Sequence, residues 1–198
     1  LSLCNKNFPN MNSNDSSNAK HNLLLDVCMA AKYEGESLNT YRAQYDATYP
    51  GSPSQICTML ARSFADIGDI VRGRGLYHGK KKKKQTERDQ LEGKLQSFFK
   101  NIHDNLDHSI KSKYNDDAKE NYYQLREDWW NANRATIWEA MTCKAEGAYF
   151  HATCSMNGSG AQANDKCRCD KEKAGKGSDG ANVTIVPTYL DYVPQYLR

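Results

Sequence analysis

Apolar side chains recur at helical spacing in three long stretches of the chain. Between about Ser54 and Val71, apolar residues occupy positions 56, 60, 64, 67 and 71, which fit a period of 3.6 residues. A second stripe follows Thr86, which suits a helix N-cap, and a third lies between about Asp117 and Cys143. The second consists of Leu91, Leu95, Phe98, Ile102 and Leu106, and the third carries Tyr122, Leu125, Trp129, Ile137 and Met141. These stripes predict three long helices that pack together.

The remaining segments predict shorter elements and loops. Leu23–Lys32 reads as a helix that ends near Gly35, because glycine commonly follows the last helical turn. Residues 144–186 are rich in Gly, Asn, Lys and Cys and predict a long crosslinked loop region. Pro187 suits the first turn of a last helix, which we expect to run to the end of the chain. No stretch alternates apolar and polar residues at any length, so we expect a mostly α fold.

Composition points to a folded chain in an oxidising setting. The 198 residues are polar on average, with 38% hydrophobic residues and a mean hydropathy of -0.85, but 3 Trp, 12 Tyr and 5 Phe supply core material. The 7 cysteines form no CxxC pair, so they read best as a disulfide framework in an extracellular setting. No apolar run approaches the ~20 residues that span a bilayer. The net charge of +3 is modest, but five consecutive lysines concentrate positive charge at residues 80–84.

This lysine run admits several interpretations. It can be a solvated loop that only adds solubility, or a contact for a polyanion such as a sulfated sugar. A nuclear targeting signal would conflict with the disulfide interpretation. The candidate glycan-binding residues are Arg72, Arg74, Lys80, Lys81, Lys82, Lys83 and Lys84.

No catalytic or cofactor motif occurs, and no metal or cofactor is expected. Asp66 and Asp69 stand three residues apart and could form a catalytic carboxylate pair, but we favour a structural role in which they pair with a buried Arg134. The three tryptophans predict core; because Trp129 and Trp130 are adjacent and point in different directions, we expect one of them near the surface.

Several segments together resemble one known family. They are LLLDVCMAAKYEGESL at 23–38, ARSFADIGDIVRG at 61–73, REDWWNANRATIWEAMTC at 126–143, KCRC at 166–169 and DYVPQYLR at 191–198. The chain is similar over essentially its whole length to the Duffy-binding-like domain, alpha class, of Plasmodium falciparum erythrocyte membrane protein 1. The resemblance implies a helical adhesion module of three subdomains. We expect the first two here, a loop-rich, disulfide-linked N-terminal part at 1–53 and a helical bundle at 54–198, with the third absent.

The resemblance also implies a disulfide pattern. It predicts the bonds Cys4–Cys28 and Cys57–Cys143, and we favour Cys154–Cys169 for a third, which leaves Cys167 unpaired.

The function that the resemblance implies is adhesion to host receptors and not catalysis. Partners would be heparan sulfate-type glycosaminoglycans, blood-group sugars, complement receptor and host antibodies, with neither nucleic acid binding nor membrane insertion. The domain would be displayed on the extracellular face of the infected red cell, where the alpha class is linked to rosetting. Two alternatives remain: recognition of a protein through an aromatic surface around Trp130, Tyr149 and Phe150, and a chain that is inactive without the third subdomain.

Overall fold

The computed structural model describes residues 19–49, 56–74, 87–115, 117, 121–147, 154, 163, 166–169 and 186–198. Within these residues the fold is helical and contains no strand, which confirms the predicted mostly α class. The long helices are α2 (Ala19–Thr48), α3 (Ile56–Val71), α4 (Glu87–Asp104) and α6 (Tyr123–Met141). The short ones are α5 (His108–Lys111), η1 (Ser112–Tyr114), η3 (Leu190–Tyr192) and η4 (Gln195–Leu197). No helix in this part of the chain is long and apolar enough to cross a membrane.

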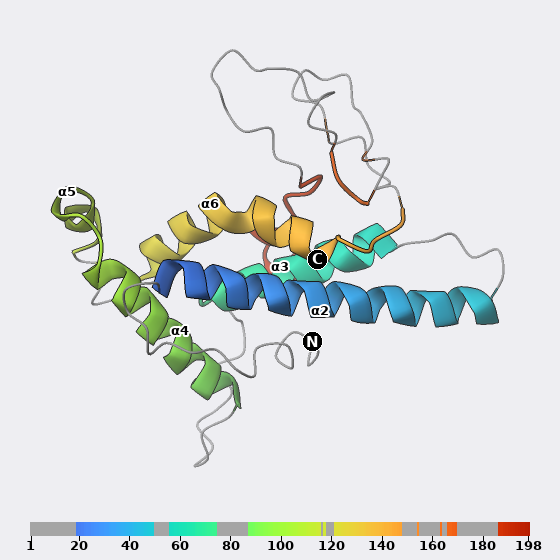
Figure 1. Ribbon diagram of the computed structural model, residues 1–198, viewed down its shortest axis with the longest axis horizontal. Helices are drawn as coiled ribbons and strands as arrows, with labels where there is room; N and C mark the ends of the chain where they lie inside the picture. The colour runs from blue at the N-terminus through green and yellow to red at the C-terminus, as the bar shows by residue number, and fades with distance from the viewer. Residues whose placement is uncertain are drawn as a thin grey trace.

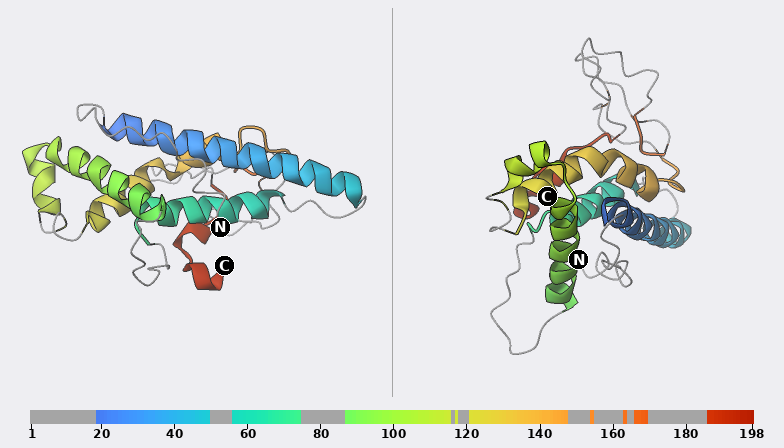
Figure 2. Two further views of the ribbon diagram at one scale, coloured as in Figure 1. Left: turned by 90° about the horizontal axis from the view of Figure 1, so that it is seen from below. Right: turned by 60° about the vertical axis from the view of Figure 1, so that its left-hand side comes forward.

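Helix α3 lies at the centre of the bundle. In Figures 1 and 2, α2 and α6 run along it, α4 crosses near one end, and the C-terminal segment lies on the side of α3 away from α2. Phe64 of α3 illustrates the packing, since its ring centroid lies 5.1 Å from the rings of both Trp130 and Trp138 on α6. A buried aromatic cluster of this kind stabilises a core beyond the simple burial of its area.

Both adjacent tryptophans are buried, so the expectation that one lies near the surface is wrong. Trp130 faces α3, and Trp129 meets Phe99 of α4 edge-on with centroids 6.0 Å apart. Because α4 covers a second side of α6, neighbouring side chains that point in different directions are both removed from water.

Helix α2 continues past Gly35 to Thr48, which corrects the predicted end near Gly35. A Cβ at Gly35 would overlap the carbonyl oxygen of Met141, so this glycine allows α2 to approach the end of α6 closely and does not cap the helix. Residues 19–48, expected within a loop-rich subdomain, therefore form the longest helix of the bundle. The proposed division between residues 53 and 54 falls outside the described residues and stays a prediction.

The last predicted helix is replaced by η3 and η4. Val193 is extended with ψ 131°, as expected for a residue before proline, and Pro194 also has ψ 142°. The two short turns therefore cannot join into one helix, and residues 186–198 follow the surface of α3 as a strap.

Helix α6 begins at Tyr123, later than the predicted Asp117. Asn121 and Tyr122 have positive φ values of 64° and 60°, so the residues before Tyr123 cannot continue α6 as a right-handed helix. Asp117 still stabilises the helix start, because its carboxylate accepts hydrogen bonds from the backbone N–H groups of Gln124 and Leu125, each at 2.9 Å.

The disulfide pattern differs from the expected one. Cys57 is bonded to Cys167, and Cys143 carries a free thiol, so the predicted bond Cys57–Cys143 and the predicted unpaired Cys167 are wrong. Cys154–Cys169 is formed as expected. Cys28 also carries a free thiol, in contrast to the expected bond with Cys4, which lies outside the described residues.

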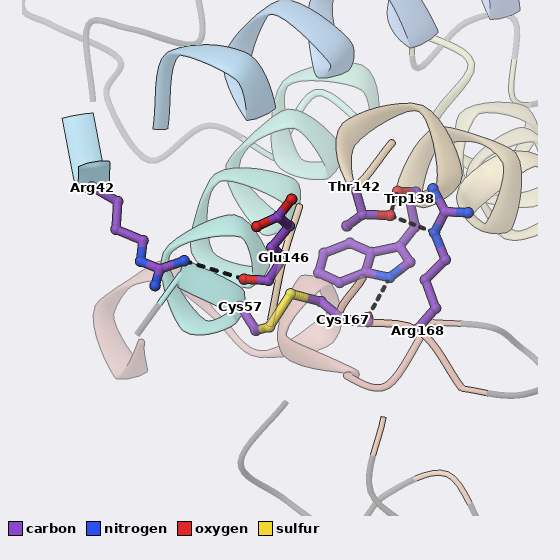
Figure 3. The surroundings of a disulfide bond; sticks show 7 residues. All are labelled: Arg42, Cys57, Trp138, Thr142, Glu146, Cys167 and Arg168. Atoms are coloured by element: carbon purple, nitrogen blue, oxygen red, sulfur yellow. Dashed lines mark hydrogen bonds between the residues drawn. A yellow bond between two sulfur atoms is a disulfide. The ribbon is translucent and has the colours of Figure 1, made fainter. Parts of the chain in front are cut away.

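Contacts around the bond explain why Cys167 replaces Cys143 (Figure 3). Trp138 donates its Nε1–H to the Cys167 carbonyl oxygen at 3.0 Å, and the Cys167 N–H donates to the Gly147 carbonyl oxygen at 3.0 Å. Arg168 donates to Thr142 Oγ1 at 2.7 Å and to the Glu139 carbonyl oxygen at 2.6 Å. These bonds dock the segment 166–169 on the end of α6 and bring Cys167 to the start of α3.

Candidate functional site

An arginine–carboxylate cluster gathers where α3 ends beside the C-terminal strap. Helix α3 closes in a Schellman motif: Gly73 has φ 70°, its N–H donates to the Ile70 carbonyl oxygen at 3.1 Å, and the Arg74 N–H donates to the Asp69 carbonyl oxygen at 2.8 Å. Cations are favourable at this end of a helix because the last carbonyl groups carry partial negative charge. The position of the arginines thus has a structural cause before any ligand is considered.

Arg72 is buried and fully engaged. Its guanidinium contacts Glu127 at 3.2 Å and Asp69 at 3.2 Å, its Nε donates to the Gly68 carbonyl oxygen at 3.0 Å, and it also donates to the carbonyl oxygen of Asp191. The prediction that Arg72 contacts a glycan is therefore wrong, because no donor of this side chain faces solvent.

Arg134 pairs with Asp191 of the strap and not with Asp66 or Asp69, which corrects the expected pairing. The guanidinium donates to both Asp191 carboxylate oxygens, at 2.7 and 2.9 Å, and Trp130 donates its Nε1–H to the same carboxylate at 2.9 Å. Both charged side chains are buried. A buried pair with this many hydrogen bonds is costly to break by removing one partner.

Asp66 and Asp69 instead share Arg198. The Arg198 guanidinium lies 3.1 Å from Asp66 Oδ1 and 2.7 Å from Asp69 Oδ2. Burial raises the pKa values of the Asp66 and Asp69 carboxyls above the ordinary value of an aspartate, although the nearby Arg198 charge opposes that shift. Two carboxylates held by one guanidinium are suited to fastening the strap onto α3, which supports a structural role for them.

A pocket of about 160 Å3 opens beside this cluster. It is lined by Asp69, Arg74, Asp191, Tyr192, Val193, Pro194 and Gln195. Arg74 is the exposed cation of the lining, with 53% of its side chain accessible, and its guanidinium pairs with Glu127 at 2.8 Å. The pocket combines one accessible guanidinium with the aromatic and aliphatic surface of residues 192–194, so it can accept a small polar group.

The charges of the cluster are balanced. Four guanidiniums face four carboxylates; the residues are Arg72, Arg74, Arg134 and Arg198 with Asp66, Asp69, Glu127 and Asp191. The cluster therefore produces no net field that would attract a polyanion from a distance. Lys80–Lys84, the densest run of positive charge in the sequence, lie outside the described residues, as do Tyr149 and Phe150.

Sequence reasoning missed three partners in the cluster: Glu127, Asp191 and Arg198. Each lies far along the chain from the residue it pairs with, so helical spacing carries no signal for the contact. One signal was available, since Asp191 is an acidic residue within the aromatic C-terminal stretch and such a residue needs a cationic partner when buried. In the described part of the chain, no three potential metal-ligating side chains gather into one group.

The fold and the bonds Cys57–Cys167 and Cys154–Cys169 define the class of the protein as a disulfide-linked helical domain. The Duffy binding domain family matches residues 1–198, so the chain belongs to that family. The comparison with curated proteins gave no match.

A solved structure gives a similar picture. The chain resembles the ICAM-1-binding DBLbeta domain of PfEMP1 IT4var13 with 30% sequence identity, a TM-score of 0.54 and coverage of 90% of this chain. The chain spans about a third of the length of that structure, of which 34% is covered. These findings confirm the resemblance to a PfEMP1 Duffy-binding-like domain, and the alpha class stays a prediction.

Proposed function

We propose that the chain is a host-receptor adhesion domain of a variant parasite surface protein, displayed on the extracellular face of the infected red cell. Family membership over the whole chain carries this proposal, and the likeness to an ICAM-1-binding domain supports it. The role is binding without catalysis. It includes the infected cell's adherence to other host cells, and rosetting if the alpha class is correct.

The mechanism that we propose first is electrostatic capture of a sulfated glycan of the heparan sulfate type. Its contacts are Lys80–Lys84 together with Arg74. Arg74 can add one short-range contact, because its side chain is half exposed although it pairs with Glu127, and it lies six residues before the first lysine of the run. Each cation contributes little alone, and many displayed copies make the binding strong. Blood-group sugar and complement receptor are further candidate receptors on the grounds of the family resemblance.

A salt series on immobilised heparin tests this mechanism. We expect the oxidised chain to bind with an affinity that falls steeply with ionic strength, because binding to a polyanion releases condensed counterions. A variant with Lys80–Lys84 changed to Ser should lose most of this binding, and Arg74→Ser should weaken it slightly. The matched control is Lys100→Ser, an exposed lysine on α4. Equal binding by wild type and the five-lysine variant would refute the glycan mechanism.

Protein recognition is the second candidate, and the ligand named for the similar solved structure favours it. Surface plasmon resonance with the ICAM-1 ectodomain tests it directly. Binding that persists at high salt and in the five-lysine variant would place the receptor contact on another surface.

A further inference from the structure

The core-facing side of α2 continues beyond the end of the bundle. On this side Leu23, Val27, Ala30 and Glu34 are buried, and Leu38 is partly buried against the core. The same side then carries Tyr41 and Tyr45, because steps of three or four residues return to one helix face. Tyr49 follows one residue after the helix end and keeps this spacing, since its N–H donates to the Tyr45 carbonyl oxygen at 2.9 Å. We call these three tyrosines the tyrosine ridge.

The tyrosine ridge is uncovered. Tyr41, Tyr45 and Tyr49 are 60%, 44% and 58% exposed, and no residue between Glu36 and Tyr49 is buried. Figures 1 and 2 show this end of α2 extending past the ends of α3 and α6. The rings of Tyr45 and Tyr49 lie 4.9 Å apart, so they form one continuous aromatic surface. The apolar stripe by which α2 packs on the core is therefore continued by tyrosines beyond the end of the described core.

The polar groups beside the tyrosine ridge are already paired. Arg42 contacts Asp46 at 2.8 Å, and Glu36 contacts Lys144 at 3.0 Å. The hydroxyl groups of Thr40 and Thr48 donate to backbone carbonyl oxygens four residues earlier. Since this surface has little unpaired charge, it is poorly suited to a sulfated glycan, whose binding depends on uncompensated cations.

The small exposed area of the tyrosine ridge argues against pairing of this ridge with the same ridge on a second copy of the chain. A tyrosine side chain can bury about 200 Å2, so three half-exposed tyrosines offer roughly 300 Å2 per chain. A stable interface needs about 800 Å2 from each partner. A partner with a groove would also cover both flanks of the projecting helix and so bury more of it, and anchors at i, i+4 and i+8 suit that geometry.

We propose that the tyrosine ridge is a receptor contact that docks into an apolar groove of a host surface protein, an inference that rests on the adhesion function proposed above. Aromatic side chains with few rotatable bonds are common anchors of protein interfaces, and tyrosine is enriched among the residues that dominate binding energy. The rings supply the contact area, while the rigid helix limits the entropy that binding costs.

Flow cytometry with fluorescent tetramers of the oxidised chain on human erythrocytes and endothelial cells tests the proposal. The variants are Tyr41→Ala/Tyr45→Ala/Tyr49→Ala and the same three positions changed to Phe. The matched control is Tyr33→Ala, because Tyr33 is 48% exposed on α2 but lies outside the tyrosine ridge, about 120° around the helix from Tyr45. On cells whose heparan sulfate has been removed with heparinase, we expect the triple alanine variant to bind roughly tenfold or more weakly, and the phenylalanine variant and the control to bind within threefold of wild type.

Digestion of the cells separates the receptor classes. Heparinase should remove only the glycan-dependent part of wild-type binding, and the part that remains should disappear after trypsin. Unchanged binding of the triple alanine variant to heparinase-treated cells, or loss of all binding after heparinase, would overturn the tyrosine ridge proposal while leaving adhesion intact. Loss of binding with a lowered melting temperature in the triple variant would assign the tyrosines to folding and also contradict it. Wild type that binds neither cell type would refute the adhesion function and this inference together.

Discussion

The bond between Cys57 and Cys167 makes a quantitative prediction that separates the structure from the family-based expectation. Replacing Cys167 with Ser opens a crosslink between residues 110 positions apart. The chain-entropy model gives about 5 kcal/mol for a loop of this length. Because a domain of this size is stable by about 5–15 kcal/mol, Cys167→Ser should remove a large part of the free energy of unfolding.

The matched control is Cys143→Ser. Cys143 carries a free, partly exposed thiol, so its replacement should change the free energy of unfolding by less than about 0.5 kcal/mol. A bond between Cys57 and Cys143 would reverse this order, because Cys143→Ser would then open the crosslink.

Urea unfolding of the oxidised variants, followed by tryptophan fluorescence, measures the difference. The three tryptophans are buried, so the signal reports loss of the core. Peptide mapping after alkylation should first establish that Cys57 and Cys143 remain thiols in Cys167→Ser. Equal losses for the two variants, or a Cys57–Cys143 peptide from wild type, would refute the assignment.

Three further predictions concern single residues. Gly93→Ala should raise the free energy of unfolding by about 0.5–1 kcal/mol, because Gly93 lies inside α4 with open space around it. Gly35→Ala should lower the free energy of unfolding, because a Cβ there overlaps a carbonyl oxygen of α6; thermal melts of the two variants should shift in opposite directions, and equal shifts would contradict the reasoning. Asp191→Asn should cost about 3–5 kcal/mol in urea unfolding because it leaves the Arg134 guanidinium buried without a negative partner, and a loss under 1 kcal/mol would show that the pair is not needed. Burial raises the pKa of Asp69 in the folded chain, so the stability that the Asp69 carboxyl contributes is present at low pH and declines as pH rises through that pKa. The free energy of unfolding of wild type relative to Asp69→Asn should therefore shrink between pH 4 and pH 7, and a difference that grows with pH would contradict this direction.

Helix periodicity predicted the central bundle well, because local spacing contains the information. The predicted start near Ser54 lies two residues before the observed Ile56, and the predicted end at Val71 agrees with α3. The predicted stripe lies in α4 from Leu91 to Ile102, but Leu106, its last member, falls two residues after the helix ends at Asp104. Gly35 was misread because a glycine that ends a helix and one that permits close helix packing look the same in a single sequence.

Contacts between distant residues could not be read from spacing. The cluster depends on the strap, which brings Asp191 and Arg198 to α6 and α3 across more than fifty residues. The expected exposure of one of the two adjacent tryptophans was misjudged for the same reason, since Trp130 packs on Phe64 of α3 and Trp129 on Phe99 of α4. The tyrosine ridge was likewise hidden, because its three positions look like ordinary core spacing until the end of the bundle is known.

Binding of the chain to host cells tests the central claim most directly. Fluorescent tetramers of the oxidised chain should bind human erythrocytes or endothelial cells saturably, and reduced, alkylated tetramers should not, because the receptor contacts depend on the crosslinked fold. Binding no stronger than that of the reduced control on both cell types would contradict an adhesion function for this chain.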